Sequence, residues 1–190
     1  MARWEPNARL RLVRSALDLF GEQGYDSTTV AQIAERAGLT KTTFFRHFPD
    51  KREVLFAGQE VHSRLLTEGV AAAPDTATPL EAVAVALDAL TASFTPEQRE
   101  FAPRLSAVIA GHSELRERLA FKELNLAATL ADALRRRGVP DPAASLAADL
   151  GLRAFSMAFA QWITPENDRP FPGLARDSLT ELHKAATTLT

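Results

Sequence analysis

The chain contains no cysteine, so disulfide bonds, zinc sites built from cysteine and thiol catalysis are all excluded. It also lacks any apolar run close to the roughly 20 residues that a membrane-spanning helix needs. The first twenty residues have no secretory apolar core, because arginines interrupt their apolar residues. We therefore expect a cytoplasmic protein, with which the absence of cysteine is compatible.

Signatures of catalysis and of cofactor binding are also missing. There is no glycine-rich phosphate loop, and the four histidines are too far apart in the sequence for zinc-ligand spacing. The tripeptide Gly111-His112-Ser113 lacks the closing glycine and the preceding strand that a nucleophile elbow needs. The sequence thus predicts no catalytic residue, no metal site and no cofactor, and we expect that the protein is not an enzyme.

The charges are divided unevenly along the chain. The whole sequence has a net charge of −2, which by itself argues against a nucleic-acid partner. Residues 1–53, however, contain nine Lys or Arg and seven Asp or Glu, which leaves thirteen and seventeen for residues 54–190. A basic N-terminal end on an acidic body is compatible with DNA binding.

The most informative stretch is Ser27–Glu53, STTVAQIAERAGLTKTTFFRHFPDKRE. Its first apolar residues are spaced three and four apart, which predicts the buried face of a short helix: Val30, Ile33, Ala34 and Ala37. Thr29 and Gln32 have the spacing of a capping box at the start of this helix. Gly38 then supplies the permissive backbone of a tight turn.

A second short helix follows this turn. Thr40 is a good N-cap, Phe44 and Phe48 share the inner face, and Pro49 ends the helix. The outer face carries hydroxyls, a ring and a cation, namely Thr42, Phe45 and Arg46, with Lys41 in the first turn. There is no carboxylate between Thr40 and Pro49, which suits a surface that meets DNA phosphates. Two such helices predict a helix-turn-helix.

The segment TTVAQIAERAGLTKTTFFRHFPDKREVL resembles the N-terminal domain of the tetracycline-repressor (TetR) family of bacterial transcription regulators. The paired threonines, the I-A-x-x-A-G turn, the T-x-F-F-R-H-F helix and the following D-K all agree in order. One departure is Phe45, where the family usually has a tyrosine that bonds a phosphate. Phe45 cannot make that hydrogen bond, but its ring could pack on a thymine methyl group.

The position of each residue predicts its part in DNA binding. Lys41 and Thr42 begin the recognition helix, the end that normally meets base edges. Thr28, Thr29 and Lys51 lie where hydroxyl, backbone N–H and ammonium groups suit phosphates. The full set of predicted DNA-binding residues is Thr28, Thr29, Thr40, Lys41, Thr42, Phe45, His47 and Lys51.

The residues before this stretch predict a first helix, and the resemblance implies that it braces the other two. Its apolar face carries Leu10, Val13, Leu17 and Phe20. Gly21 and Gly24 are expected to end it. Arg3, Arg9 and Arg11 could contact phosphates, although most surface arginines are only solvated.

The remainder of the chain is predicted to be helical throughout. A capping box of Asp50 and Glu53 predicts a helix at Lys51 that runs to about Ala73. Further helices are predicted from the start signals Thr78-Pro79-x-Glu81 and Thr95-Pro96-x-Gln98, over 113–137 and 141–163, and at the C-terminal end. This gives an all-α fold of about nine helices, with a DNA-binding domain at 1–53 and a second domain at 54–190.

The resemblance implies that residues 54–190 form a helical domain for ligand binding and dimerisation. A small-molecule pocket is then expected among polar and aromatic residues on these helices: His62, Phe94, Arg104, Asn125, Phe155, Phe159 and Trp162. The implied protein is a homodimeric regulator of a palindromic operator, and repression is the commoner outcome in the family. The alternative is an all-α small-molecule-binding protein or enzyme whose helix-turn-helix is structural. The sequence does not identify the effector, the operator, the regulated genes or the sign of regulation.

Overall fold

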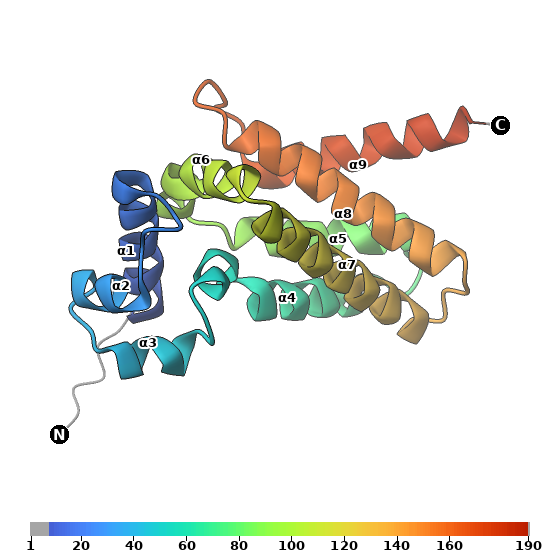
Figure 1. The fold of residues 1–190 in the computed structure, drawn as a ribbon. Coiled ribbons are helices and arrows are strands. Elements are labelled where there is room, and N and C mark those ends of the chain that lie inside the picture. Colours follow the sequence, from blue (N-terminus) through green and yellow to red (C-terminus); the bar gives the residue numbers. More distant parts are fainter. Residues whose placement is uncertain (1–7, 190) are drawn as a thin grey trace. The chain divides into compact units, whose positions relative to one another are not determined.

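The computed structural model describes residues 8–189, and within them the chain is entirely helical (Figure 1). The elements are α1 (Ala8–Gln23), α2 (Val30–Arg36), α3 (Lys41–His47), the 3-10 helix η1 (Arg52–Phe56), α4 (Gln59–Ala72), α5 (Pro79–Ala92), α6 (Pro96–Gly111), α7 (Ser113–Arg136), α8 (Ala143–Trp162) and α9 (Phe171–Thr187). Nine α-helices and no strand in this range confirm the predicted all-α class. Arg3, a predicted phosphate contact, lies outside the described residues.

The described chain forms two compact units. The first unit contains residues up to Gly58 together with Phe101–Leu119, and the second contains Gln59–Glu100 and the residues from Ala120 onward. The sequence-based division at residue 53 separates expected functions and stays a prediction. Packing divides the chain differently, because residues 101–119 share a core with α1.

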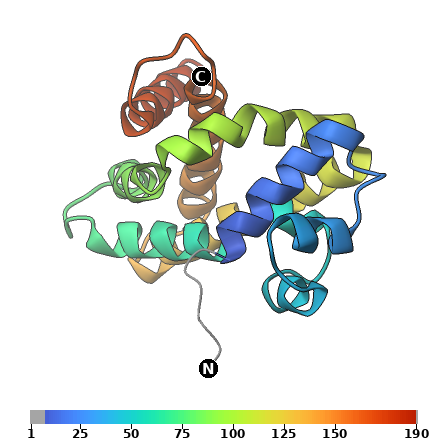
Figure 2. The same cartoon turned by 90° about the vertical axis from the view of Figure 1, so that its left-hand side faces the viewer.

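The core of the first unit is built on the apolar face of α1. Leu12 and Leu17 are buried there with Ile109 and Leu115, which lie almost a hundred residues further along the chain. Figures 1 and 2 both show α1 beside the 101–111 part of α6. Helices α1, α2 and α3 therefore share their core with residues from 101–119.

The structure confirms the local signals that begin and end the short helices. Thr29 and Gln32 form a capping box at the start of α2, and the Thr40 side chain accepts a hydrogen bond from the N–H of Thr43 at the start of α3. Gly38 has φ +65°, a left-handed conformation that favours glycine in the turn between them. These caps fix where each helix starts, and so which residues lie on its outer face.

The predicted helix from Lys51 to about Ala73 is wrong in its first part. The Asp50 carboxylate does accept hydrogen bonds from the N–H groups of Arg52 (2.8 Å) and Glu53 (3.1 Å). Only the short 3-10 helix η1 follows, and α4 begins at Gln59. The reason is that three consecutive residues, Val54–Phe56, are all buried, whereas an α-helix buries one stripe.

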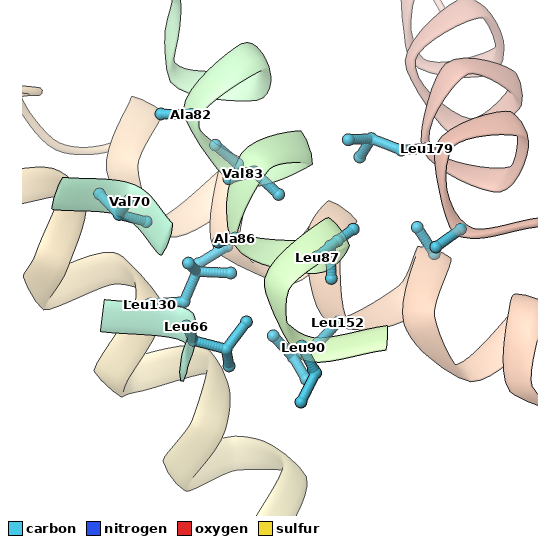
Figure 3. Packing of buried hydrophobic residues seen from close by; sticks show 14 of the residues in the cluster. Leu66, Val70, Ala82, Val83, Ala86, Leu87, Leu90, Leu130, Leu152 and Leu179 are labelled. Carbon is cyan, nitrogen blue, oxygen red and sulfur yellow. The ribbon is translucent and has the colours of Figure 1, made fainter. Parts of the chain in front are cut away.

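The second unit is organised around α5. Helix α5 packs against α4, α8 and α9, and α8 packs against α9. Figure 3 shows the apolar side chains that meet between these helices, including Leu66 and Leu87, with Leu130 of α7. Gly69 on α4 lies against the backbone of Ala86 on α5, so the two helices cross closely. The capping box of Thr78 and Glu81 begins α5 as predicted.

Two arginines satisfy the C-terminal carbonyl groups of neighbouring helices in the second unit. The Arg137 guanidinium donates to the carbonyls of Val70 (3.1 Å) and Ala73 (2.9 Å) at the end of α4. The Arg99 guanidinium donates to the carbonyl of Trp162 (2.9 Å) at the end of α8. A cation at a helix C-terminus also interacts favourably with the helix dipole.

Candidate functional site

Contacts within the first unit hold the helix-turn-helix in place. Arg36 of α2 makes two hydrogen bonds, of 2.8 and 2.7 Å, to the carboxylate of Glu22 in α1. The Arg11 guanidinium of α1 donates to the carbonyl of Ala37, at the C-cap of α2. Both contacts join α1 to α2, so the turn that leads to α3 has a fixed position.

Helix α3 has one buried face and one exposed face. Phe44 is 0% exposed and Phe48 is 1% exposed, so the rings anchor the helix as predicted. Lys41, Thr42 and Arg46 are exposed, and the Phe45 ring is 48% exposed. The Lys41 ammonium lies 5.9 Å from the centre of the Phe45 ring. The exposed face is therefore cationic and aromatic and carries no carboxylate.

Such a face is chemically matched to a nucleic acid. Cations attract phosphates and can bond the edges of guanine, while a hydroxyl or an aromatic ring can contact other base edges. Arg46 was placed on this face by the helical pattern but was not among the predicted contact residues. Its exposure makes it a second cation on the surface of the helix, in addition to Lys41.

The threonines at the helix starts and His47 lie at the border of this face. Thr29 and Thr40 are exposed, but their hydroxyl groups already serve as N-caps. The His47 ring is partly exposed and lies 6.5 Å from the Phe48 ring. Thr29 and Thr40 begin their helices, and His47 ends α3.

Two predicted phosphate contacts are used inside the protein. Thr28 is 2% exposed, and its hydroxyl donates to the carbonyl of Gly24 (2.8 Å). The Lys51 ammonium donates to the carbonyls of Tyr25 (2.6 Å) and Thr28 (3.0 Å) and lies 4.1 Å from the centre of the Tyr25 ring. Partial burial lowers the pKa of Lys51, and its DNA contact stays a prediction.

Arg9 is partly buried and packs against the ring of Phe48. Its guanidinium carbon lies 5.2 Å from the centre of the Phe48 ring. Its Nε is buried, and it is the one buried side-chain nitrogen or oxygen of the described residues without a hydrogen-bond partner. Arg9 therefore packs on the inner side of α3, and its contact with DNA stays a prediction.

Six aromatic rings of the second unit form one cluster, which we call the aromatic cluster: His62, Phe94, Phe155, Phe159, Trp162 and Phe171. The Phe94 ring contacts all the others, at centroid distances from 5.2 to 6.3 Å. The rings of Trp162 and Phe171 stack at 4.8 Å and are buried, with 6% and 3% exposed. The cluster joins residues of α4, α8 and α9 to Phe94 after α5.

Five of the seven residues predicted to line a pocket meet in this cluster, and two do not. Arg104 belongs to the first unit, where it pairs with Asp18 at 3.1 Å. Asn125 is exposed on α7. Both were chosen as polar residues between apolar neighbours, but each lies on the outward side of its helix. Phe171 was missed because Pro165, Pro170 and Pro172 around it predicted a loop.

His62 is the one imidazole in the aromatic cluster, and the indole N–H of Trp162 is the other polar group on its rings. Its ring stacks on Phe94 with an interplanar angle of 25° and a centroid distance of 5.3 Å. Burial lowers the pKa of His62 to about 4, so the imidazole is neutral at neutral pH. A neutral imidazole offers one hydrogen-bond donor and one acceptor.

The described residues contain no candidate metal site and no candidate membrane-spanning helix. In residues 8–189, no three His, Asp or Glu side chains are grouped in a way that could hold a metal ion. Across the same part of the chain, every helix is too short or too polar to span a bilayer.

Comparison with known proteins gives matches of three kinds. A family model described as bacterial regulatory proteins of the tetR family matches residues 12–57. The chain is 39% identical over 82 residues to the HTH-type transcriptional regulator TcmR of Streptomyces glaucescens, a match that covers 43% of this chain and 36% of that protein. It is 33% identical over 93 residues to the uncharacterized HTH-type transcriptional regulator TtgW of Pseudomonas putida, covering 49% of this chain and 68% of that protein.

A solved structure is similar over nearly the whole chain. The TetR-family transcriptional repressor FadR of Thermus thermophilus, in complex with lauroyl-CoA, aligns with a TM-score of 0.55 over 92% of each chain at 23% identity. At that identity the likeness shows the fold alone. The family model covers the helix-turn-helix, and the match to TcmR spans little more than a third of that protein.

Proposed function

The chain belongs to the TetR family of bacterial regulatory proteins, and we propose that it controls transcription by binding a palindromic DNA operator as a homodimer. The observation that carries this proposal is the exposed face of α3, where Lys41, Thr42, Phe45 and Arg46 stand free of carboxylates. A recognition helix of this kind enters the major groove.

We assign base reading to the first turn of α3. Lys41 and Thr42 are exposed there, and Lys41 can donate to the O6 and N7 of guanine. Phe45 offers its exposed ring to a thymine methyl group. Arg46 supplies a phosphate contact or a second base contact from the next turn. Thr28 is left out of the proposed interface because its hydroxyl is buried and already bonded.

Dimerisation is proposed to occur through α8 and α9. A palindromic operator has two half-sites, which require two recognition helices in one particle. Leu146 of α8 is 58% exposed, and Leu150 and Met157 lie on the same side of the helix and are partly exposed. An apolar stripe of this kind on a surface helix is a typical contact surface for a second subunit.

A small molecule is proposed to bind in the second unit and to release the operator. It must bind the DNA-competent and DNA-incompetent states with different affinities, or it shifts nothing. The aromatic cluster is the candidate site, since binding sites are mostly apolar with a few polar groups.

The test of DNA binding uses the palindromes found in the DNA beside the gene. Each is labelled and titrated with the purified full-length chain, and binding is followed by fluorescence anisotropy in a salt series. We expect one palindrome to bind far more tightly than a shuffled duplex of the same composition, with affinity falling steeply with salt. If matched and shuffled duplexes bind equally, the helix-turn-helix is structural. That result would favour the alternative hypothesis of an all-α small-molecule-binding protein or enzyme.

A further inference from the structure

The aromatic cluster combines a buried floor with rings that remain accessible. Trp162 and Phe171 are almost completely buried and stack with their planes 11° apart. Phe94, Phe155 and Phe159 pack against them, yet all three are only partly buried. Rings that are held firmly by neighbours and still present some surface offer preformed aromatic contacts to a ligand.

His62 gives this apolar cluster a hydrogen-bonding group that the protein does not use. No hydrogen bond joins its ring nitrogens to any other group in residues 8–189. The one buried side-chain nitrogen or oxygen without a partner in that part of the chain is Arg9 Nε, so the nitrogens of His62 are not sealed off. Because its ring lies flat against Phe94, His62 can donate or accept at the edge of the cluster.

Arg99, a charged residue that bonds the backbone of Trp162, is already occupied. The Arg99 guanidinium donates to the carbonyls of Trp162, Thr164 and Asn167, where it closes the end of α8. It is thus committed to backbone oxygens. An anionic ligand on the rings would have to leave water and would find Arg99 already bonded to backbone oxygens.

A cationic ligand is the main alternative, because aromatic rings can attract cations through their faces. Burial disfavours the imidazolium form of His62 and lowers its pKa to about 4. The same desolvation would oppose a ligand cation at the same place.

We propose that the aromatic cluster binds a planar, uncharged aromatic molecule that carries one hydroxyl or carbonyl group, and that His62 forms the hydrogen bond to this group. The proposal rests on the proposed small-molecule control and specifies the class of effector. The rings supply stacking and edge contacts for a flat molecule. His62 selects for a molecule that carries one polar atom on the rim of its ring system.

The test follows ligand binding through Trp162. The sequence has two tryptophans, so Trp4→Phe in the full-length chain leaves Trp162, within the cluster, as the sole fluorescent tryptophan. The probes share one ring system: naphthalene, 2-naphthol, 2-naphthoate and 2-naphthylmethylammonium. Affinities are measured by isothermal titration calorimetry at pH 7.5, and the change in Trp162 emission reports the place of binding.

We expect 2-naphthol to bind at least about tenfold more tightly than the anion or the cation, because a buried charge here has no partner. It should bind about fivefold more tightly than naphthalene, the effect of one neutral hydrogen bond. His62→Phe should remove the preference for 2-naphthol over naphthalene while both still bind. His62→Gln, which keeps a neutral donor and acceptor, should restore part of the preference, and His183→Phe, at an exposed histidine of α9, should change nothing.

Three results would overturn the proposal. They are equal or tighter binding of a charged probe, an unchanged 2-naphthol preference in His62→Phe, and no probe that alters Trp162 emission. Operator binding is measured on the same preparation without probes. If the operator is not bound but the probes follow the expected order, the proposed DNA function fails while the ligand class stands.

Discussion

At the scale of single residues, Lys51 has an internal role that the sequence pattern does not reveal. The pattern places a cation directly after the recognition helix, where it suits a phosphate. In the structure its ammonium closes the connection between α1 and α2, through two carbonyl groups and the Tyr25 ring. Sequence position alone cannot separate the phosphate contact from this internal contact, because both need a cation just after α3.

Lys51→Ala distinguishes the two roles. We expect the free energy of unfolding to fall by about 1–3 kcal/mol, since two carbonyl groups lose a charged donor. The salt dependence of operator binding should keep its slope. Chemical denaturation and the anisotropy salt series measure these two quantities. A slope reduced by about one for each subunit would instead assign Lys51 to a phosphate.

Lys41 is predicted to read a base. Lys41→Ala should lower the discrimination between the matched operator and one with a single changed base pair by about 1–3 kcal/mol at one position of each half-site. The folded state should keep its stability, because the side chain is exposed. Binding to a series of single-base-pair operator variants provides the measurement. Arg46→Ala serves as a matched exposed cation on the same helix, and equal losses at every position would show that Lys41 binds a phosphate.

His62 makes stability depend on pH. Its folded-state pKa of about 4 lies below the unfolded value of about 6.5, so the unfolded chain takes up the proton first. The free energy of unfolding is therefore highest, with respect to this group, above about pH 6.5. It falls as the pH decreases toward 4, by a total on the order of 3 kcal/mol. Denaturation at each pH should therefore show a greater acid loss for the natural chain than for His62→Phe. His183→Phe controls for removal of a histidine, and parallel curves for all three proteins would contradict the prediction.

The sequence located the aromatic residues of the candidate ligand site better than its polar ones. Aromatic residues on apolar stripes converge in a helical core, so Phe94, Phe155 and Trp162 met as expected. Arg104 and Asn125 lie outside because a long or small polar side chain at the edge of a stripe can turn to solvent. Phe171 was hidden by the prolines on either side, although a proline in the first turn is compatible with a helix.

At the scale of helices, close approach between α4 and α5 depends on a residue without a side chain. A Cβ added to Gly69 would meet the backbone of Ala86. Gly69→Ala should therefore lower the free energy of unfolding by about 1–3 kcal/mol, despite the higher helix propensity of alanine. Gly173→Ala in α9 is the matched control, since its Cβ would meet nothing within 4 Å. Urea unfolding tests this, and equal stabilisation by both substitutions would rule out the tight crossing.

The sequence predicted helix starts well because caps are local. Thr78-Pro79-x-Glu81 contains every group that begins α5, and the same is true of Thr29 and Gln32 in α2. The break between η1 and α4 was missed because Val54–Phe56 are buried by parts of the chain that lie far away in the sequence. Arg118, which donates to the Glu53 carboxylate at 2.8 Å, is sixty-five positions from it.

At the scale of the whole molecule, the proposed dimer can be tested with an exposed leucine on α8. Leu146→Glu should give a monomer at micromolar concentration and abolish operator binding, because a carboxylate would be buried in the interface. Leu182 of α9 is less suitable, because it packs partly on the core of the second unit and a charge there would also disturb folding. Leu124→Glu on α7, where the leucine is 69% exposed, is the matched control. Analytical ultracentrifugation decides, and a dimeric Leu146→Glu would exclude this part of α8 from the interface.

The split composition of the first unit has a consequence for protein synthesis. Residues 8–58 leave the ribosome long before residues 101–119, which supply Ile109 and Leu115 to their shared core. At about 5–20 residues per second, the 61 residues from 58 to 119 take roughly 3–12 s to translate. During that interval the nascent helix-turn-helix has an incomplete core with apolar side chains exposed. A pause in translation before residue 119 would lengthen this exposure, and it is there that a chaperone acting on the nascent chain would matter most.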